Sequence, residues 1–222
     1  MKFKEFLLQE GLYDPGIFKA FFMAGGPGSG KTFIASSAFT GTGLRFVNSD
    51  SHFERALKNA GLKATMPESE KEIRDRMREK AKSLMYKQLE QYLFGRLGLV
   101  VDATGRDYNR INQEYRKLYN LGYDCYMVFV NTTLDVAIER NKIRTRNIPE
   151  YVVVQSWKGV QSNIGKFQRL FGQQNFIVVD NNKAGEDVFK QVSKRIRGLV
   201  KKKVTNPIAI QWIAMQMQSR RR

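Results

Sequence analysis

The chain has 222 residues, 42% of them hydrophobic, and a net charge of +17, which suits one globular domain with a polyanionic partner. No stretch is long and apolar enough to span a bilayer, and the single residues Cys125 and His52 exclude an intrachain disulfide and a multi-histidine zinc site. We therefore expect a reducing compartment, the cytoplasm, or the host cell cytoplasm if the protein is viral. Residues 1–8 predict a short amphipathic helix rather than a signal peptide, because polar residues interrupt the apolar ones.

The first predicted strand, residues 18–24, leads into Gly25-Gly26-Pro27-Gly28-Ser29-Gly30-Lys31-Thr32. This is G-x-x-x-x-G-K-[ST], the phosphate-binding P-loop, and the helix predicted over 32–39 completes its required context. Glycines let the backbone approach a phosphate, and successive N–H groups then point at its oxygens. Lys31 is expected on the β- and γ-phosphates and Thr32 on Mg²⁺. We expect ATP to contact the loop residues Gly26, Pro27, Gly28, Ser29, Gly30, Lys31 and Thr32.

The second predicted strand, 44–48, is followed by Ser49 and Asp50. A carboxylate at the end of a strand beside a P-loop can accept a proton from an acceptor hydroxyl, so Asp50 is the candidate catalytic base. The alternative is that Asp50 only caps the helix that begins near Ser51. A long charged helix is predicted over 68–97, with an apolar stripe formed by Ile73, Met77, Ala81, Leu84 and Leu89.

The third predicted strand, 97–102, ends at Asp102, which has the position of a carboxylate that holds Mg²⁺ through water. Thr104 and Arg106 follow in a turn that is expected to face the same cleft and to contact substrate. The alternative is that Asp102 only ends the strand while Asp107 caps the helix predicted over 107–120.

The fourth predicted strand, 123–130, leads to a helix over 134–144 that carries Arg140 and Arg144. Residues four apart share a helix face, and two guanidinium groups on one face can clamp a triphosphate and stabilise the transferring phosphoryl group. Arg146 is expected to extend this set into the loop before Pro149. The alternative is that these arginines form an ordinary solvated face.

A helix over 149–171, a fifth strand over 175–180 and a helix over 186–203 complete the alternation of strands and helices. Such alternation predicts an α/β fold, here a three-layer P-loop NTPase fold with a five-stranded parallel sheet flanked by helices. Ligands of such sheets bind beyond the carboxyl ends of the strands. The polar residues Asn48, Asp50, Asp102 and Thr104 all fall at those ends.

A boundary is predicted near Val204–Pro207, between a kinase domain over 1–204 (core 18–180) and a basic C-terminal helix and tail over 205–222. The helix expected over 208–217 either packs on the body or offers Trp212 and its methionines as a docking face. Residues 194–222 carry nine lysines and arginines and no acid, which leaves a charge of +8 on the remainder. Nucleic acid is the expected partner, and a solubilising tail is the alternative.

The motifs GGPGSGKT, NSD, VVDATG and RNKIRTRNIPEYVVVQSWKGVQ, in this order, resemble the kinase domain of phage-type polynucleotide kinase and are similar to the zeta-toxin kinases. The resemblance covers residues 18–180, and the compact form would suit a bacteriophage gene product. It implies nucleotide and Mg²⁺ on Lys31 and Thr32, Asp50 as the base, and Arg140 and Arg144 as lid residues. Polynucleotide kinases tend to carry an arginine three residues after the base. Here that residue is Phe53, and Arg55, two further on, is the remaining candidate for substrate contact.

Two functions remain open. The first is a kinase that transfers the ATP γ-phosphate to a nucleic-acid 5′-hydroxyl, a modified base or a small molecule such as a nucleotide sugar. The second is a non-catalytic nucleotide-binding module that docks on nucleic acid or a viral assembly. The Asp50 carboxylate and the paired arginines favour catalysis, because a binding module has no need of a carboxylate at that position.

Overall fold

The computed structural model describes residues 12–62, 68–144, 148–183 and 186–220. Its centre is one parallel sheet in the order β2-β3-β1-β4-β5, which confirms the predicted fold class. Each strand lies within two residues of the range that the sequence predicts. The five strands are β1 (Lys19–Ala24), β2 (Arg45–Val47), β3 (Leu99–Asp102), β4 (Asp124–Asn131) and β5 (Phe176–Asp180).

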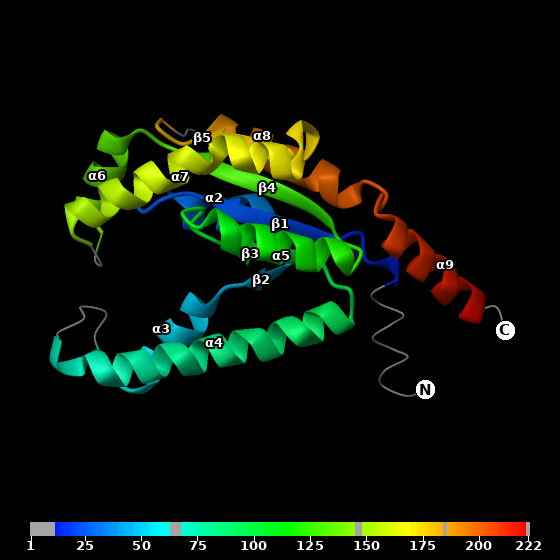
Figure 1. Cartoon of the computed structure of the whole chain (residues 1–222), viewed down its shortest axis with the longest axis horizontal. Coiled ribbons are helices and arrows are strands. Elements are labelled where there is room, and N and C mark those ends of the chain that lie inside the picture. Colours follow the sequence, from blue (N-terminus) through cyan, green and yellow to red (C-terminus); the bar gives the residue numbers. More distant parts are fainter. Residues whose placement is uncertain (1–11, 63–67, 145–147, 184–185, 221–222) are drawn as a thin grey trace.

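Helices cover both faces of the sheet (Figure 1). One face packs against α2 (Lys31–Phe39) and α8 (Glu186–Lys201), and the other against α5 (Tyr108–Asn120), α7 (Glu150–Phe171) and α9 (Pro207–Arg220). Strand residues alternate between the two cores, so that Phe21 faces α2 whereas Phe22 faces α7. A short 3-10 turn, Gln173–Asn175, precedes β5.

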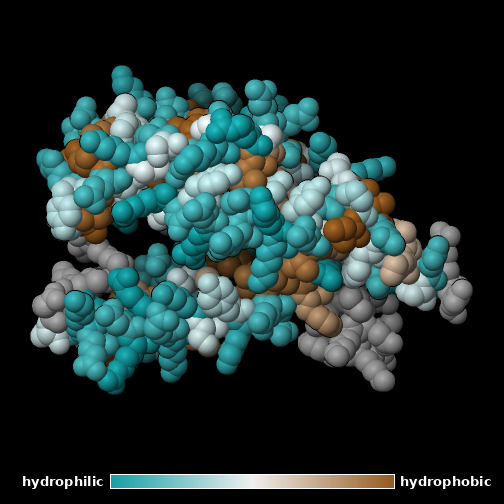
Figure 2. Space-filling model, in the orientation of Figure 1, coloured by the Kyte–Doolittle hydropathy of each residue, from teal (hydrophilic) through white to brown (hydrophobic). Residues whose placement is uncertain are grey.

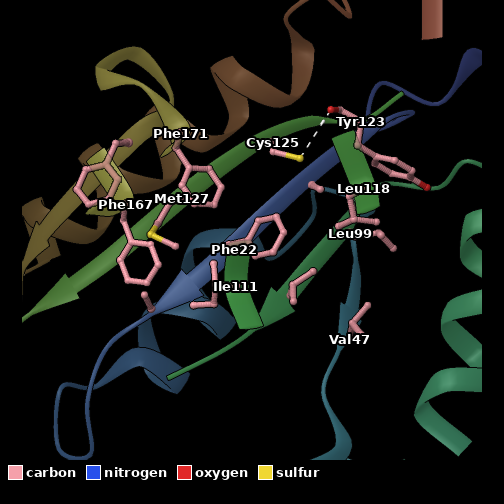
Figure 3. Packing of buried hydrophobic residues seen from close by; sticks show 14 of the residues in the cluster. Phe22, Val47, Leu99, Ile111, Leu118, Tyr123, Cys125, Met127, Phe167 and Phe171 are labelled. Atoms are coloured by element: carbon pink, nitrogen blue, oxygen red, sulfur yellow. Dashed lines mark hydrogen bonds between the residues drawn. The ribbon is translucent and has the colours of Figure 1, made fainter. Parts of the chain in front are cut away.

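The core beneath α5 and α7 combines aliphatic side chains with several aromatic rings. Figure 3 shows Phe22 of β1, Met127 of β4 and the α7 residues Phe167 and Phe171 converging on one another. The rings of Phe22 and Phe171 meet edge to face at 5.3 Å. Cys125 is buried in the same cluster, as the sequence suggests for a small hydrophobe. This packing fixes β1, the strand from which the P-loop begins, and its neighbour β4.

The pair α3 (Ser49–Asn59) and α4 (Lys71–Phe94) lies beyond the β2 edge, with α4 preceded by the 3-10 turn Glu68–Glu70. The predicted apolar stripe of α4 is wrong at two positions, because Ile73 is 50% and Leu84 45% exposed. Met77 and Ala81 instead pack against α3, and Leu89 packs against the main core. The reason is that α4 bridges two small packing surfaces rather than lying along one.

Helix α6 (Leu134–Lys142) ends two residues earlier than the sequence predicts. The buried side chain of Asn141 accepts a hydrogen bond from the Ile148 N–H and donates one to the Ile148 carbonyl, at 3.2 and 2.7 Å. These two hydrogen bonds hold Ile148 against the end of the helix. The expectation that Arg140 and Arg144 share one helix face is therefore wrong, because Arg144 lies past the helix.

The C-terminal helix α9 packs on the body. Its Ala209 is fully buried, and Trp212 meets Phe18 edge to face at 5.3 Å. The Asp124 carboxylate holds the preceding segment by accepting from the backbone N–H groups of Thr205 and Asn206 and from Lys19 Nζ. No helix within the described ranges has the length and hydropathy to cross a membrane. Residues 1–8, Arg146, Arg221 and Arg222 lie outside the described residues.

Candidate active site

The P-loop joins β1 to α2 through two glycines with left-handed backbone. Gly28 has φ 76° and Gly30 has φ 79°, a region that residues with a side chain avoid. A Cβ on Gly28 would lie 2.2 Å from the Ala137 carbonyl oxygen of α6, so no side chain fits there. The α2 N-terminus begins directly after Gly30, and its free N–H groups open toward the loop.

Two buried donors around this loop lack a hydrogen-bond partner among the described residues: the Ser29 hydroxyl and the Nη1 group of Arg140. The other nitrogen of Arg140, Nη2, donates to the Asn182 carbonyl at 3.4 Å. A buried donor without an acceptor is costly, and a phosphate supplies several acceptor oxygens. The Ser29 hydroxyl and the Arg140 Nη1 group are therefore suited to donate hydrogen bonds to a nucleotide phosphate.

Asn181, at the carboxyl end of β5, holds the P-loop from behind. Its Nδ2 group donates to the Ser29 carbonyl at 2.6 Å, across 152 positions of sequence. Neither Asn181 nor Asn182 is among the site residues predicted from the sequence. The signal was available, because both residues follow the fifth predicted strand and strand ends carry the site in such sheets.

Lys31 forms an ion pair with Asp102 at the end of β3. The second oxygen of that carboxylate accepts a hydrogen bond from Asn48 Nδ2 at 2.7 Å. All three side chains line one cavity. The carboxyl ends of β1, β2 and β3 thus meet in a single network, as the parallel topology requires. Thr32 lies in the first turn of α2 and is exposed.

Asp50 lies in the first turn of α3 and is exposed to the same cavity. It is not the helix cap, because Asn48 occupies that position and its Oδ1 accepts from the Asp50 N–H at 2.7 Å. The Asp50 carboxylate has no hydrogen bond or ion pair within the described part of the chain. It is therefore available to a ligand. Asp107, by contrast, does cap α5 through the Arg110 N–H.

The remaining predicted residues divide into two groups. Thr104 lines the cavity, and its carbonyl accepts from the Gly25 N–H at 3.0 Å, which ties the β3 extension to the P-loop. Arg106 lines an adjoining groove with Asn163 and Lys166. The structure does not bring Arg55 into the cavity, since it is exposed on the outer side of α3, and Arg144 is exposed beyond α6.

The cavity itself measures about 370 Å³ and lies between α4 and α5, beside Lys31. Figure 2 shows the molecule hollowed between the α3–α4 pair and the layers above it. One wall is apolar and the other combines apolar with charged groups. From α4 come Met85, Tyr86, Leu89 and Leu93, and from α5 come Arg110, Ile111, Glu114, Lys117 and Leu118.

Arg78 of α4 is a third site residue, after Asn181 and Asn182, that is absent from the predicted set. Its guanidinium carbon lies 4.9 Å from the centre of the Phe53 ring, and Phe53 is only 3% exposed. Arg78, Phe53 and Asp50 line one groove that adjoins the cavity. Nothing in the local sequence signals this contact, because α3 and α4 supply its two halves from 25 positions apart.

Comparisons with known proteins agree with this architecture. The chain of the AvrRxo1-ORF1:AvrRxo1-ORF2 structure with sulphate ions is 15% identical over 91% of this chain and 73% of its own, with a TM-score of 0.55. A gluconokinase from Sinorhizobium meliloti 1021 is 15% identical over 83% of this chain and 95% of its own, with a TM-score of 0.51. A chain of the Pnkp1/Rnl/Hen1 RNA repair complex is 18% identical over 67% of this chain and 46% of its own, also at 0.51.

The parallel sheet, the P-loop and these neighbours define a P-loop kinase fold. A family model described as an AAA domain matches residues 21–166, which is more than half of the chain, and the chain belongs to that family. No curated protein matches it. At these identities the structural neighbours establish the fold and not the substrate.

Proposed function

We propose that the protein is an ATP-dependent kinase that transfers the γ-phosphoryl group to a hydroxyl of an acceptor bound between α4 and α5. The observation that carries this proposal is the position of Asp50. Its carboxylate, which has no partner among the residues that the structure describes, opens into the cavity that also contains Lys31 and Asp102. A module that only binds nucleotide has no use for a free carboxylate there, whereas an acceptor hydroxyl needs a proton acceptor.

On the donor side, the P-loop N–H groups, Ser29 and Arg140 bind the phosphates, and Lys31 leaves Asp102 to reach the β- and γ-phosphates. No cluster of three or more acidic, histidine or cysteine side chains exists among the described residues, so a metal would rely on Thr32, Asp102 and phosphate oxygens. When bound, Mg²⁺ offsets the charge on the phosphates. Arg144, just past the end of α6, can contact the ATP phosphates, and we assign the same role to Arg146 from its place in the sequence.

In the reaction, the acceptor oxygen forms a bond to the γ-phosphorus while the bond from that phosphorus to the bridging oxygen breaks. Asp50 takes the hydroxyl proton, and ADP leaves with the electron pair of the broken bond. Arg140 stabilises the charge on the transferring group. Thr104 and Arg106 border the acceptor on the side of β3.

The cavity limits the acceptor. A volume of about 370 Å³ is at the small end of ligand pockets, and it admits one nucleoside-sized group rather than a duplex. The apolar wall of Leu89 and Ile111 suits a ring face, while Arg110 and Lys117 suit a neighbouring anionic group. A terminal or extruded nucleotide of a nucleic acid therefore fits best. Arg78, stacked on Phe53, brings a guanidinium close to Asp50 and can take the part of the arginine that the family carries in place of Phe53.

A small-molecule acceptor, as in the zeta-toxin kinases, is the second candidate. The observation that favours it is the residue three positions after the base. The family tends to carry an arginine there, whereas this chain has Phe53, which is buried. Arg55, the other candidate for substrate contact, is exposed and does not line the cavity.

Incubation with γ-labelled ATP and separate pools of DNA, RNA, nucleosides and nucleotide sugars tests both candidates. Label on a 5′ end or a base supports the first, and label on a sugar nucleotide supports the second. Retention of all label in ATP, under conditions in which the protein binds ATP, would refute the kinase proposal and leave the binding module. Asp50→Asn serves as the negative control in each pool.

A further inference from the structure

A basic groove lies on the sheet face opposite α5 and α7, between α2 and α8. It measures about 540 Å³ and is separate from the cavity beside Lys31. Its lining residues are Ser37 of α2 and Phe189, Lys190, Ser193, Lys194, Arg197, Gly198 and Lys201 of α8. The apolar face of α8 is already buried against the sheet, so this groove is formed by the outer side of the helix.

Among the side chains that the structure describes, every polar one lining the groove can donate a hydrogen bond, and none is a carboxylate or carboxamide. Lys194, Arg197 and Lys201 are exposed and form no ion pair with any residue that the structure describes. The hydroxyls of Ser37 and Ser193 likewise have no hydrogen-bond partner in the described ranges. A groove of donors alone is complementary to a ligand that presents acceptors alone, and a phosphodiester backbone is such a ligand.

Gly198 is an independent sign that this groove is kept open. It lies within α8, where glycine weakens a helix relative to alanine. A Cβ built on Gly198 meets no atom within 4 Å, and its φ is not in the left-handed range, so neither packing nor backbone geometry requires glycine. Any side chain there would project into the groove instead.

The spacing of the charges points to a strand. Lys190, Lys194, Arg197 and Lys201 recur at intervals of four, three and four residues and so follow one side of α8. At about 1.5 Å per residue they span roughly 16 Å, which is about five phosphates of one stacked strand at roughly 3.4 Å each. Beside the groove, the rings of Phe33 and Phe189 pack edge to face at 5.0 Å, and Phe33 is 58% exposed.

We propose that the groove between α2 and α8 binds a single strand of nucleic acid, with the phosphates on Lys194, Arg197 and Lys201 and a base stacked on Phe33. Exposed aromatic rings beside a basic groove are the combination that single-strand binding uses. This site is distinct from the proposed kinase site and acts without nucleotide. It would hold a strand on the protein whatever the identity of the phosphate acceptor.

The test measures binding of a fluorescent single-stranded oligonucleotide by anisotropy at several salt concentrations, with no ATP present. The triple variant Lys194→Gln, Arg197→Gln, Lys201→Gln should flatten the log–log salt slope by about two units, at roughly 0.7 per phosphate contact. The matched control Lys58→Gln, Lys80→Gln, Lys87→Gln removes the same charge from exposed positions on α3 and α4. An equal change in both variants would overturn the site, as would the absence of binding by the wild-type protein.

A steric variant separates the groove from charge alone. Gly198→Leu fills the groove and should weaken oligonucleotide binding about tenfold without lowering the melting temperature. The matched control is Gly165→Leu, at an exposed α7 position where a Cβ meets only the Arg169 side chain at 3.8 Å. Unchanged affinity in Gly198→Leu, or preferential binding of the wild-type protein to anionic lipid vesicles, would overturn the proposal. Oligonucleotide binding in this groove requires no phosphoryl transfer. A negative result in these binding tests therefore leaves the proposed kinase activity untouched, and loss of the kinase proposal leaves the groove untouched.

Discussion

The Asn48 carboxamide donates a hydrogen bond to the Asp102 carboxylate at 2.7 Å, and this contact joins the ends of β2 and β3. The same side chain accepts from the Asp50 N–H and so caps α3. Asn48 therefore positions both Asp102, the carboxylate expected to hold the metal, and α3, the helix that carries the candidate base Asp50. Its position as a strand-end residue was visible in the sequence, but its two partners were not.

Substitution of Asn48 should separate these two contributions. Asn48→Ala loses the cap and should lower the free energy of unfolding by about 1 kcal/mol, together with a loss of phosphoryl transfer. Asn48→Ser keeps a capping oxygen but cannot reach Asp102, so it should retain stability and still lose activity. Chemical denaturation and labelled-ATP assays on both variants provide the measurement. Full activity in Asn48→Ser would mean that the contact with Asp102 is dispensable.

Asp50→Asn should lower phosphoryl transfer by about 10²-fold or more while ATP binding persists. The carboxylate has no partner within the described ranges, so its loss should not reduce stability. Single-turnover assays and ATP titration distinguish the two properties. Lys31→Ala provides the complementary control, because it should weaken ATP binding itself. If Asp50→Asn turns over at the wild-type rate, Asp50 has no part in catalysis.

Two glycines with the same backbone geometry test the P-loop's contact with α6. Gly28 and Gly41 have φ of 76° and 73°, so alanine should cost about 1–2 kcal/mol of left-handed strain at either. Only at Gly28 does a Cβ also clash with backbone, 2.2 Å from the Ala137 oxygen, whereas nothing lies within 4 Å at Gly41. Gly28→Ala should therefore destabilise the protein more and abolish ATP binding, as measured by thermal unfolding with and without ATP–Mg²⁺. Similar behaviour of the two variants would contradict the contact.

Local patterns predicted the elements well because their causes are local. The continuous apolar run of residues 20–24 is typical of a central parallel strand, and all six residues of β1, Lys19 included, are buried. The P-loop likewise depends on consecutive residues. These features required no knowledge of what packs against them.

The errors arise where distant residues decide the outcome. Helix α6 stops at Lys142 because Asn141 bonds to Ile148 across a loop, which periodicity does not reveal. Ile73 reads as a core residue and is half exposed, since α4 meets two separate surfaces. Asn181 supports Ser29 from 152 positions away. The strand order, with β1 between β3 and β4, is also a property of the whole chain.

Alkaline pH should destabilise the protein through Cys125. Burial, followed by the nearby Asp124 charge, raises the pKa of the thiol well above its ordinary value of 9.0. Above pH 9 the unfolded chain loses this proton while the native state keeps it, so stability falls as pH rises, by about 1.4 kcal/mol at pH 10. Burial also raises the pKa of Tyr123 and Tyr126, which extends the loss above pH 10.

The pKa of Lys19 is lowered, chiefly by burial, and its effect has the opposite sign. Between that lowered pKa and 10.5 the unfolded chain binds more protons, so this lysine adds stability as pH rises. Cys125→Ala removes the thiol contribution alone. Denaturant titrations at pH 8, 9 and 10 should show a shallower loss between pH 9 and 10 in the variant than in the wild type. If the stability of the variant and of the wild type falls equally between pH 9 and 10, the thiol has the same pKa in the folded and unfolded states.

Removal of α9 should destabilise the whole fold. Truncation after Val204 deletes Trp212, which packs on Phe18, and deletes the Thr205 and Asn206 N–H groups that bind the buried Asp124. Loss of a packed tryptophan alone costs about 3–5 kcal/mol, and for a chain of this size each kcal/mol lowers the melting temperature by roughly 2–4 °C. We therefore expect a melting temperature lower by at least about 6 °C, measured by differential scanning calorimetry.

The matched control is truncation after Arg220, which removes only Arg221 and Arg222 and leaves all of these contacts in place. It should melt within about 1–2 °C of the full chain, because surface changes away from packed features cost at most about 0.5 kcal/mol. If the truncation after Val204 melts like the control, residues 205–220 are an appendage rather than part of the fold. In that case the ion pair of Lys19 with Asp124 would be enough to stabilise the ends of β1 and β4 without α9.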